Sequence, residues 1–281
     1  MISFTFDNIH DDVTGYEQLA AFYTLLGNKA DAQVSLDFCK WFDASMCSPL
    51  ACALEHLRGR GHHFSLGICD PDIHDILCKN FFFTEQAFSS TPRDDTWGST
   101  ISYQRFLPSQ IEDFQDYIIE NFPREYLPTM TEKLWERMTD GFLEIFANAN
   151  QHAEADSVFV CGQYFPHKRR LKFTITDTGI GFQKRILKSR GLTLSPADAI
   201  EWGMKGGNTT KKNDPGGVGL NIIKEFIQRN RGIIQVVSHS GYWTMYNHAV
   251  KKQPLKTSFP GTAVHITIRT DDPCSYRLAS E

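Results

Sequence analysis

The chain has 281 residues, enough for one large domain or two modest ones. With 41% hydrophobic and 22% charged residues, its composition is that of an ordinary globular protein and argues against disorder. The net charge of −4 disfavours wholesale binding to nucleic acid or to an anionic membrane surface, although a local basic patch stays compatible with it.

Three further features set expectations about the compartment. No run approaches the roughly 18 apolar residues of a membrane-spanning helix. The start of the chain, MISFTFDNIH, lacks the basic and apolar regions of a signal peptide. The cysteines are odd in number and form no CxxC pair, so reduced thiols are a simpler explanation than a disulfide framework or a zinc ribbon. We therefore expect a cytoplasmic protein.

The first elements along the chain are short. Residues 33–38 (QVSLDF) and 64–68 (FSLGI) predict strands. Between them, residues 45–60 predict a helix with leucines at helical spacing, and residues 72–80 predict a second one. Strand, helix, strand and helix within about 50 residues indicate a small parallel α/β unit. The polar, turn-rich residues 89–100 (SSTPRDDTWGST) indicate a linker or long loop.

The second part of the chain has the strongest helical pattern. Residues 132–152 carry apolar side chains at steps of three and four, namely Leu134, Met138, Phe142, Ile145 and Ala149. Strands are expected at 157–163, 171–176, 233–238 and 263–269, and another helix at 220–229. The simplest assembly is an α/β fold with helices on one face of a mixed sheet. We expect two domains, at residues 1–100 and 101–281.

Three polar side chains follow the edge of the apolar stripe on the long helix. Glu144, Asn148 and His152 are four residues apart, so they share one face of the helix. A solvated helix flank would show the same pattern. An amide and a carboxylate one turn apart can also hold a hydrated divalent cation and a water.

A carboxylate and two glycines come directly after a predicted strand, in residues 177–181 (DTGIG). A carboxylate at a strand end can accept a hydrogen bond from an exocyclic amine, and glycines let the backbone approach a ligand. A tight turn explains the glycines equally well. The third glycine of the dinucleotide fingerprint is absent and no GxxxxGK[ST] segment occurs, so classical dinucleotide and Walker-type phosphate sites are disfavoured.

Glycine-containing segments also precede the last helix and the last strand. Residues 214–220 (DPGGVGL) lead into a helix, where free backbone N–H groups suit a phosphate. Residues 203–214 (GMKGGNTTKKND) have almost no apolar side chains, which fits a flexible surface loop or a mobile lid over an anionic ligand. Residues 260–262 (PGT) enter the last strand, where the threonine can hydrogen-bond a buried neighbour.

The order of these segments is more specific than any one of them. Over residues 105–270, a helix with ExxxNAxxH, a strand with DxGxG, a lid, GGxGL before a helix and PGT before a strand resemble the GHKL (Bergerat-fold) ATP-binding domains. That family includes histidine kinases, type II topoisomerases and anti-sigma-factor kinases. The resemblance implies a Bergerat-fold α/β sandwich that binds ATP and Mg2+. The resemblance is to the histidine kinase-like, anti-sigma-factor kinase type. No phosphoacceptor-histidine helix pair and no long transducer segment are seen, which disfavours a sensor histidine kinase, a topoisomerase and a full-length chaperone.

The resemblance implies a role for each matched side chain. Asn148 would coordinate the Mg2+ that bridges the phosphates, and Glu144 would be the catalytic residue that positions or deprotonates a nucleophile. Asp177 would recognise the adenine amine, with Thr262 supporting that contact. His152 matches a histidine that is common in some branches of the family.

Glycines and lysines complete the nucleotide site that the resemblance implies. Gly179 and Gly181 would shape the floor of the pocket. The residues that would meet the phosphates, at the start of a helix and on the lid, are Gly217, Gly219, Lys211 and Lys212.

Residues 20–88 resemble, more loosely, a STAS domain, the fold of anti-sigma-factor antagonists. The likeness rests on the segment VSLDFCKWFDASMCSPLACAL and on HHFSLGI and DIHDILCKNFFF after it. Antagonists are phosphorylated on a hydroxyl directly after the aspartate that begins this helix, whereas here Ala44 follows Asp43. Ser45 comes one residue later, as a phosphorylation site or as an ordinary helix N-cap.

Together these features predict an ATP-binding regulatory protein with a STAS-like domain before a GHKL-type domain. One function is Mg-dependent ATP hydrolysis or phosphoryl transfer to a serine or threonine of a partner protein, which the presence of Glu144 favours. The other is a non-catalytic module whose lid closes on ATP and changes a protein interface. The intact motifs disfavour a structural protein with a decayed site. A homodimer is compatible with these functions, and no membrane or direct nucleic-acid contact is expected.

Overall fold

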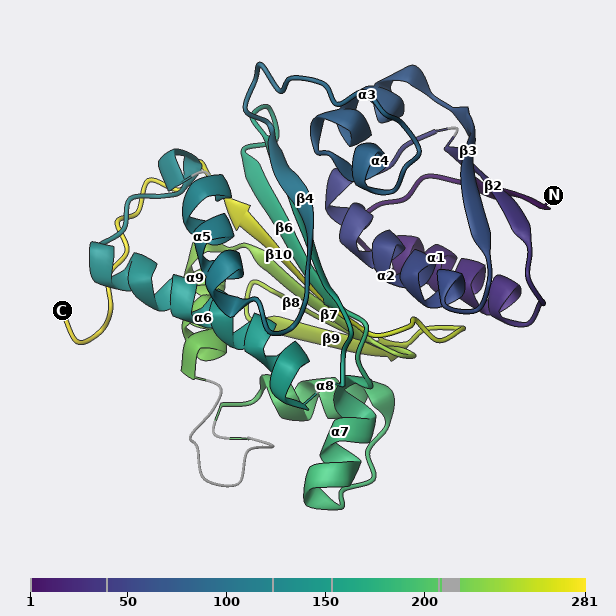
Figure 1. Cartoon of the computed structure of the whole chain (residues 1–281). Helices are drawn as coiled ribbons and strands as arrows, with labels where there is room; N and C mark the ends of the chain where they lie inside the picture. The colour runs from purple at the N-terminus through teal and green to yellow at the C-terminus, as the bar shows by residue number, and fades with distance from the viewer. Residues whose placement is uncertain (1, 39, 123, 153, 207, 209–217) are drawn as a thin grey trace.

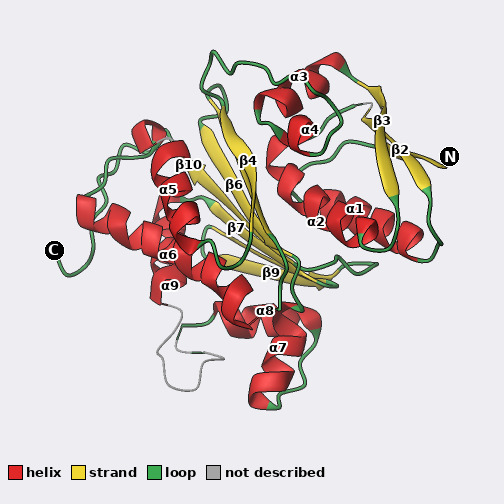
Figure 2. Cartoon of the chain, viewed as in Figure 1, coloured by secondary structure: helices red, strands yellow, loops and turns green. Residues whose placement is uncertain are grey.

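Two β-sheets and the helices packed on them make up the structure, a computed structural model of the chain (Figures 1 and 2). The described residues are 2–38, 40–122, 124–152, 154–206, 208 and 218–281. Along the chain, the elements fall into two groups, one for each sheet.

The N-terminal sheet is small and parallel. Its strands β1 (Ile2–Phe6), β2 (Gln33–Phe38) and β3 (His63–Cys69) lie in this order, with parallel pairing on both sides of β2. Helix α1 (Val13–Gly27) connects the first two strands, and α2 (Cys47–Arg58) connects the last two. The small parallel α/β unit predicted from the sequence is therefore confirmed.

Helix α2 begins differently from the expectation. A 3-10 turn, Ala44–Met46, precedes it, and Met46 in the N-cap position makes no side-chain hydrogen bond to the helix. Ser45 lies inside this turn, is only 1% exposed, and its hydroxyl has no hydrogen-bond partner among the described residues. The expected N-cap role of Ser45 is wrong, because the residue is wound into the turn instead of preceding the helix.

Two more helices follow the small sheet. Helix α3 (Pro71–Lys79) is the second predicted helix, and the carboxylate of Asp70 caps its N-terminus. The short helix α4 (Phe82–Glu85) was not predicted. Residues 86–99 form no helix or strand, in agreement with the predicted linker, and lead to the second sheet.

The second sheet has seven strands in the order β4-β5-β6-β10-β7-β8-β9. These are β4 (Thr100–Phe106), β5 (Val158–Phe165), β6 (Arg170–Asp177), β7 (Ile233–Ser238), β8 (Gly241–Tyr246), β9 (Ala249–Pro254) and β10 (Thr262–Arg269). All neighbouring pairs are antiparallel, so the sheet is not mixed as the sequence analysis expected. Strands β5, β6, β7 and β10 are the four predicted ones.

Helices cover one face of this large sheet, as predicted. They are α5 (Ile111–Asn121), α6 (Glu132–His152) and α9 (Val218–Asn230) (Figure 1). The apolar stripe of α6 is buried and joins a hydrophobic core with the inner side chains of the sheet. Two further helices, α7 (Gly181–Arg190) and α8 (Pro196–Met204), follow β6 and lie near one end of the sheet (Figure 1).

The N-terminal unit covers the other face of the large sheet, which was not predicted. Helix α2 packs on β5 and β6, where the hydroxyls of Ser48 and Thr176 are 3.1 Å apart. The thiol of Cys52 donates a hydrogen bond to the carbonyl of Pro260 over 2.7 Å. Apolar side chains of both units share one hydrophobic core. The layers are therefore small sheet, α1 and α2, large sheet, and α5, α6 and α9 (Figure 2).

Two further properties of the described part of the chain concern membrane-spanning helices and the state of the cysteines. None of its helices is both long enough and apolar enough to span a bilayer. The cysteines within it are free thiols, as the sequence predicted.

Candidate functional site

Four residues predicted to bind the nucleotide line one cavity, namely Asn148, Asp177, Gly181 and Thr262. Asn148 comes from α6, Asp177 ends β6 and Thr262 begins β10. Antiparallel pairing places Asp177 directly opposite Thr262, and Asn148 reaches the same cavity from the helical layer. The cavity has a volume of about 40 Å³. Its apolar lining side chains are Ile145, Phe182, Met204, Leu220 and Val264.

Asp177 provides the acidic group of this cavity. One of its carboxylate oxygens accepts a hydrogen bond from the N–H of Gly179 at 2.8 Å. Burial raises the pKa of Asp177 to about 6, although the Gly179 N–H and the charge of Arg185 act in the opposite direction. At neutral pH the carboxylate is thus still largely ionised and can accept a hydrogen bond from a ligand amine.

Thr262 and Gly181 belong to a compact hydrogen-bonded corner. The hydroxyl of Thr262 lies 3.1 Å from that of Ser238, which accepts a hydrogen bond from the N–H of Phe182 at the start of α7. Gly181 has a φ of +73°, and a Cβ there would lie 2.5 Å from the Ser238 hydroxyl oxygen. This position therefore requires glycine, because a side chain would be both strained and in contact with the corner.

Asn148 carries the oxygen predicted to bind Mg2+, and a cation already contacts it. Arg185 of α7 donates a hydrogen bond from Nη2 to Oδ1 of Asn148 at 3.2 Å. Burial lowers the pKa of Arg185 to about 10, against the charge of Asp177, so the guanidinium stays protonated at neutral pH. The sequence analysis missed Arg185, whose only signal was a basic residue one helical turn after DTGIG.

Glu144 caps helix α9 in this structure. Its Oε2 accepts hydrogen bonds from the N–H of Gly219 at 2.8 Å and of Leu220 at 3.4 Å. A helix N-terminus stabilises a carboxylate through its free N–H groups and its dipole. The Gly219 N–H predicted to meet a phosphate therefore holds the predicted catalytic side chain.

Two glycines allow α6 and α9 to approach each other at this point. A Cβ on Gly219 would lie 2.6 Å from Cα of Gly141, and a Cβ on Gly141 would lie 2.7 Å from the Gly219 carbonyl oxygen. Gly219 thus has a packing role beside its predicted phosphate role. Gly141 was missed, although a glycine inside a strong helix pattern is a recognisable signal.

Some predicted residues cannot be placed. Lys211, Lys212 and Gly217 lie outside the described residues, and so does the side chain of His152. In the described ranges, no three His, Cys, Asp or Glu side chains cluster to hold a metal by themselves. Mg2+ commonly binds through one or two protein oxygens together with phosphates and water, so Asn148 fits an ion that arrives with a nucleotide.

Comparison with known protein families agrees with the ordered motifs. The family described as histidine kinase-, DNA gyrase B-, and HSP90-like ATPase matches residues 136–272. The chain therefore contains a GHKL-type ATPase domain, which extends from within α6 to just after β10. This range includes the described candidate residues and does not reach the N-terminal unit. A search of curated proteins found no match.

Proposed function

We propose that the chain is a cytoplasmic regulator that uses ATP and Mg2+, as an ATPase or as a serine/threonine protein kinase of the anti-sigma-factor kinase type. The observation that carries this proposal is the cavity in the matched ATPase domain to which Asn148, Asp177 and Thr262 all contribute. The carboxylate of Asp177 accepts a hydrogen bond from the adenine amine, and the Thr262 hydroxyl lies opposite it. Asn148 holds Mg2+, which would neutralise phosphate charge when bound.

Glu144 is the proposed general base. It lies one helical turn from Asn148, so it is close to where the phosphates would lie. In this role it takes the proton of an attacking water or of a partner's serine or threonine hydroxyl. Because it now caps α9 through Gly219, its release would free the same N–H group for a phosphate. Phosphate binding and the release of the base would thus be one event.

The N-terminal unit is the proposed STAS-like regulatory domain. Its parallel sheet with two connecting helices supports this assignment, and we place the two domains at residues 1–100 and 101–281. The buried Ser45 hydroxyl and the alanine at position 44 make this unit a poor substrate for its own kinase. The phosphoryl acceptor would therefore belong to a separate regulatory partner.

ATP turnover and ATP dissociation constants of three variants test the proposal. Glu144→Ala is expected to lower turnover about 10²–10⁴-fold while ATP still binds, since a general base contributes to rate. Asn148→Ala is expected to lower both turnover and affinity, because it removes the metal ligand. Glu136→Ala, at an exposed position on the same helix, is the matched control and should leave both unchanged. Absence of ATP binding by the wild-type chain would contradict the proposal.

One observation favours a second function, an ATP-gated interaction module without turnover. Glu144 already has a structural task as the cap of α9, so its presence does not require chemistry. This function would hold if wild-type protein binds ATP but shows neither hydrolysis nor transfer with candidate partners present. Glu144→Ala would then change the ATP-dependent interaction, through the altered start of α9, and leave no rate to measure.

A further inference from the structure

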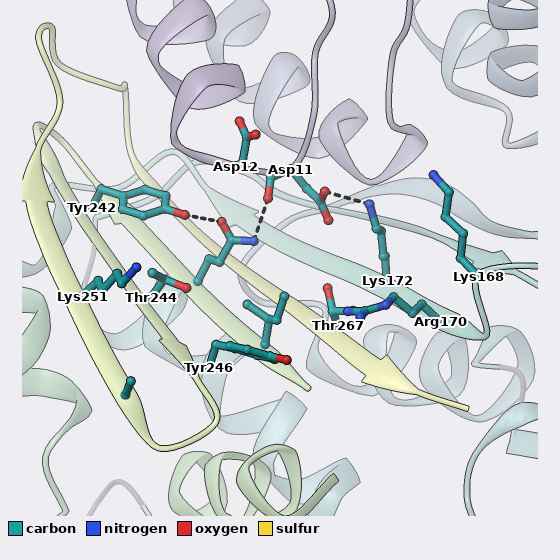
Figure 3. A pocket seen from close by; sticks show the side chains of 13 residues that line it. Asp11, Asp12, Lys168, Arg170, Lys172, Tyr242, Thr244, Tyr246, Lys251 and Thr267 are labelled. Atoms are coloured by element: carbon teal, nitrogen blue, oxygen red, sulfur yellow. Dashed lines mark hydrogen bonds and ion pairs between the residues drawn. The ribbon is translucent and has the colours of Figure 1, made fainter. Parts of the chain in front are cut away.

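A second pocket lies on the face of the large sheet that the N-terminal unit partly covers (Figure 3), and it shares no lining residue with the nucleotide cavity. Its volume of about 490 Å³ is in the range of small-molecule sites. Strands β6, β10, β7, β8 and β9 form its floor, and Asp11 and Asp12, from the segment between β1 and α1, close one side. Both units of the chain therefore contribute to it.

The pairing register explains why polar side chains gather on this floor. Lys172, Thr267, Ile233 and Tyr246 are consecutive cross-strand neighbours and form one row across the sheet. Residues two apart on a strand face the same side, so Thr244 of β8 belongs to the next row on the same face. The face of the sheet toward α5, α6 and α9 is packed in an apolar core. These two polar rows are on the opposite face, where they line the pocket.

Cations stand at two opposite ends of the pocket. Arg170 and Lys168 lie at the β6 end, and Lys251 lies on β9 (Figure 3). Three strands separate β6 from β9, so their backbones are about 19 Å apart at the usual strand spacing. Within the described residues, neither Arg170 nor Lys251 makes a hydrogen bond or an ion pair through its side chain. Lys168 contacts the rings of Trp41 and Phe165.

The acidic side chains of the pocket are already engaged. Asp11 forms an ion pair with Lys172 at 2.7 Å and contacts His265 at 2.7 Å. Asp12 caps helix α1 by accepting the N–H groups of Thr14 and Gly15. These carboxylates therefore leave the terminal cations available to a ligand.

The middle of the pocket is uncharged. Thr244 and the buried Thr267, whose hydroxyl lies 3.0 Å from Nε2 of His265, form part of the floor. The ring of Tyr246, 52% exposed, lies between the two cationic ends (Figure 3). Gln235 is held by two hydrogen bonds, from its amide to the Asp11 carbonyl and from the Tyr242 hydroxyl to its oxygen. A ligand in this space would have acidic groups at its ends and a neutral body between them.

We propose that this pocket binds a small organic dianion whose two carboxylate or phosphate groups are separated by an uncharged middle. One acidic group contacts Arg170, whose planar guanidinium suits the paired oxygens of either group, with Lys168 beside it. The other acidic group contacts Lys251. Because the wall beside the ligand carries Asp11 and Asp12, the bound dianion would touch both units.

Calorimetric titration of the full chain at low ionic strength tests this site with defined probes. The dicarboxylates succinate, adipate and suberate vary the distance between two carboxylates, and 3-phosphoglycerate places a phosphate at one end. Acetate and inorganic phosphate are the controls with a single acidic group. We expect at least one two-ended probe to bind about tenfold or more tightly than either control, because it makes a second charge-assisted contact. The order of the probes distinguishes carboxylate from phosphate ligands.

Two substitutions and one matched control locate the binding. Arg170→Ala and Lys251→Ala are each expected to raise the dissociation constant of the best probe about tenfold. Lys252→Ala removes the same charge from the opposite face of β9, where it pairs with Asp198 and Glu201, and should leave the constant unchanged. Lys251 is exposed and Arg170 is half-buried, so unfolding midpoints would verify that the variants are folded.

The inference is overturned if no two-ended probe binds more tightly than acetate or phosphate. It is equally overturned if neither Arg170→Ala nor Lys251→Ala weakens binding. Asp177→Asn separates this site from the nucleotide cavity, because it should weaken ATP and leave the best probe unaffected. Failure at one site can thus be told from failure at the other.

Discussion

Asp177 is subject to two opposing physical demands. Burial at the end of β6 disfavours its charged form and raises its pKa to about 6. Its proposed role as the acceptor for an adenine amine needs that charge, and the Gly179 N–H and the nearby Arg185 help to keep it at neutral pH. The protein without nucleotide therefore holds an ionised group at a cost in stability.

Replacing Asp177 by asparagine is expected to stabilise the protein without nucleotide at pH 7.5. The folded-state pKa of about 6 lies above the ordinary value of 3.8, so ionisation destabilises the fold above about pH 6. Asparagine resembles the protonated acid and removes this cost, which we expect to amount to about 1–2 kcal/mol after the loss of the Arg185 interaction is included. The advantage should shrink as the pH falls toward 3.8, where the wild-type acid is protonated.

Urea denaturation of both proteins at several pH values measures this difference. Asp116→Asn, at an exposed position on α5, is the control and should show no such trend. If Asp177→Asn is less stable than wild type at every pH, the ionised carboxylate of Asp177 does not destabilise the fold. Because the same substitution removes the proposed acceptor for adenine, the gain in stability should accompany weaker ATP binding.

At the scale of elements, the crossing of α6 and α9 joins packing to the site. Gly141 and Gly219 bring the two helices so close that Glu144 can reach the N-terminus of α9. The position of the backbone N–H groups proposed to bind a phosphate therefore depends on glycine at both 141 and 219.

Gly141→Ala is expected to destabilise the protein by about 1–3 kcal/mol, although alanine is the better helix former. The added Cβ would lie 2.7 Å from the Gly219 carbonyl oxygen and from a methyl carbon of Ile223, so α9 must shift. Asp140→Ala, at the adjacent exposed position, should change stability by less than about 1 kcal/mol. Thermal and urea unfolding give both values, and nucleotide titration should show weaker ATP binding only for Gly141→Ala. Equal stability of the two variants would mean that the crossing adapts.

The elements that could be predicted from the sequence are those that bury one face, because burial of one face leaves a regular pattern of apolar residues. Helix α6 begins and ends as expected, because its apolar stripe packs on a single sheet. Strand β9 was missed, since all its side chains are exposed and no alternation marks it. Strand β8 was also missed, because it lies between two turns and its sequence has only a short apolar run.

The candidate site was predictable for residues that belong to ordered motifs and not for those that reach it through packing. Asp177 and Thr262 come from the motifs, and their pairing in the sheet brings them together. Arg185 reaches the cavity only because α7 folds back toward α6, which no local pattern encodes. The alternating pattern of β6 did not show whether its polar face is exposed or covered. In the structure this face is covered by α2, and Thr176 contacts Ser48.

At the scale of the whole molecule, the two units are joined by buried charge as well as by a shared apolar core. Lys172 of β6 lies 2.7 Å from Asp11 and 3.2 Å from Asp43, both in the N-terminal unit. Burial alone would raise the pKa of Asp11, yet His265 and Lys172 hold it well below its usual range. The stabilisation from Asp11 is therefore present at neutral pH and is lost as the pH falls through its folded-state pKa.

Lys172→Met tests how strongly this network holds the two units together. The substitution keeps most of the side-chain volume but leaves Asp11 and Asp43 buried without their shared cation, so we expect a loss of about 3–5 kcal/mol at neutral pH. Lys252→Met also removes a lysine with two acidic partners, Asp198 and Glu201, but at a more exposed position, and should cost no more than about 1 kcal/mol.

Urea denaturation, followed by tryptophan fluorescence and by circular dichroism, distinguishes loss of global stability from separation of the units. If the network unites them, wild type unfolds in one transition and Lys172→Met either unfolds earlier or shows two transitions. The loss should be smaller in strong acid, because protonation of Asp11 removes one of the buried charges that has lost Lys172 as its partner. Equal effects of the two lysine substitutions would mean that the shared apolar core, and not the charge network, holds the N-terminal unit against the ATPase sheet.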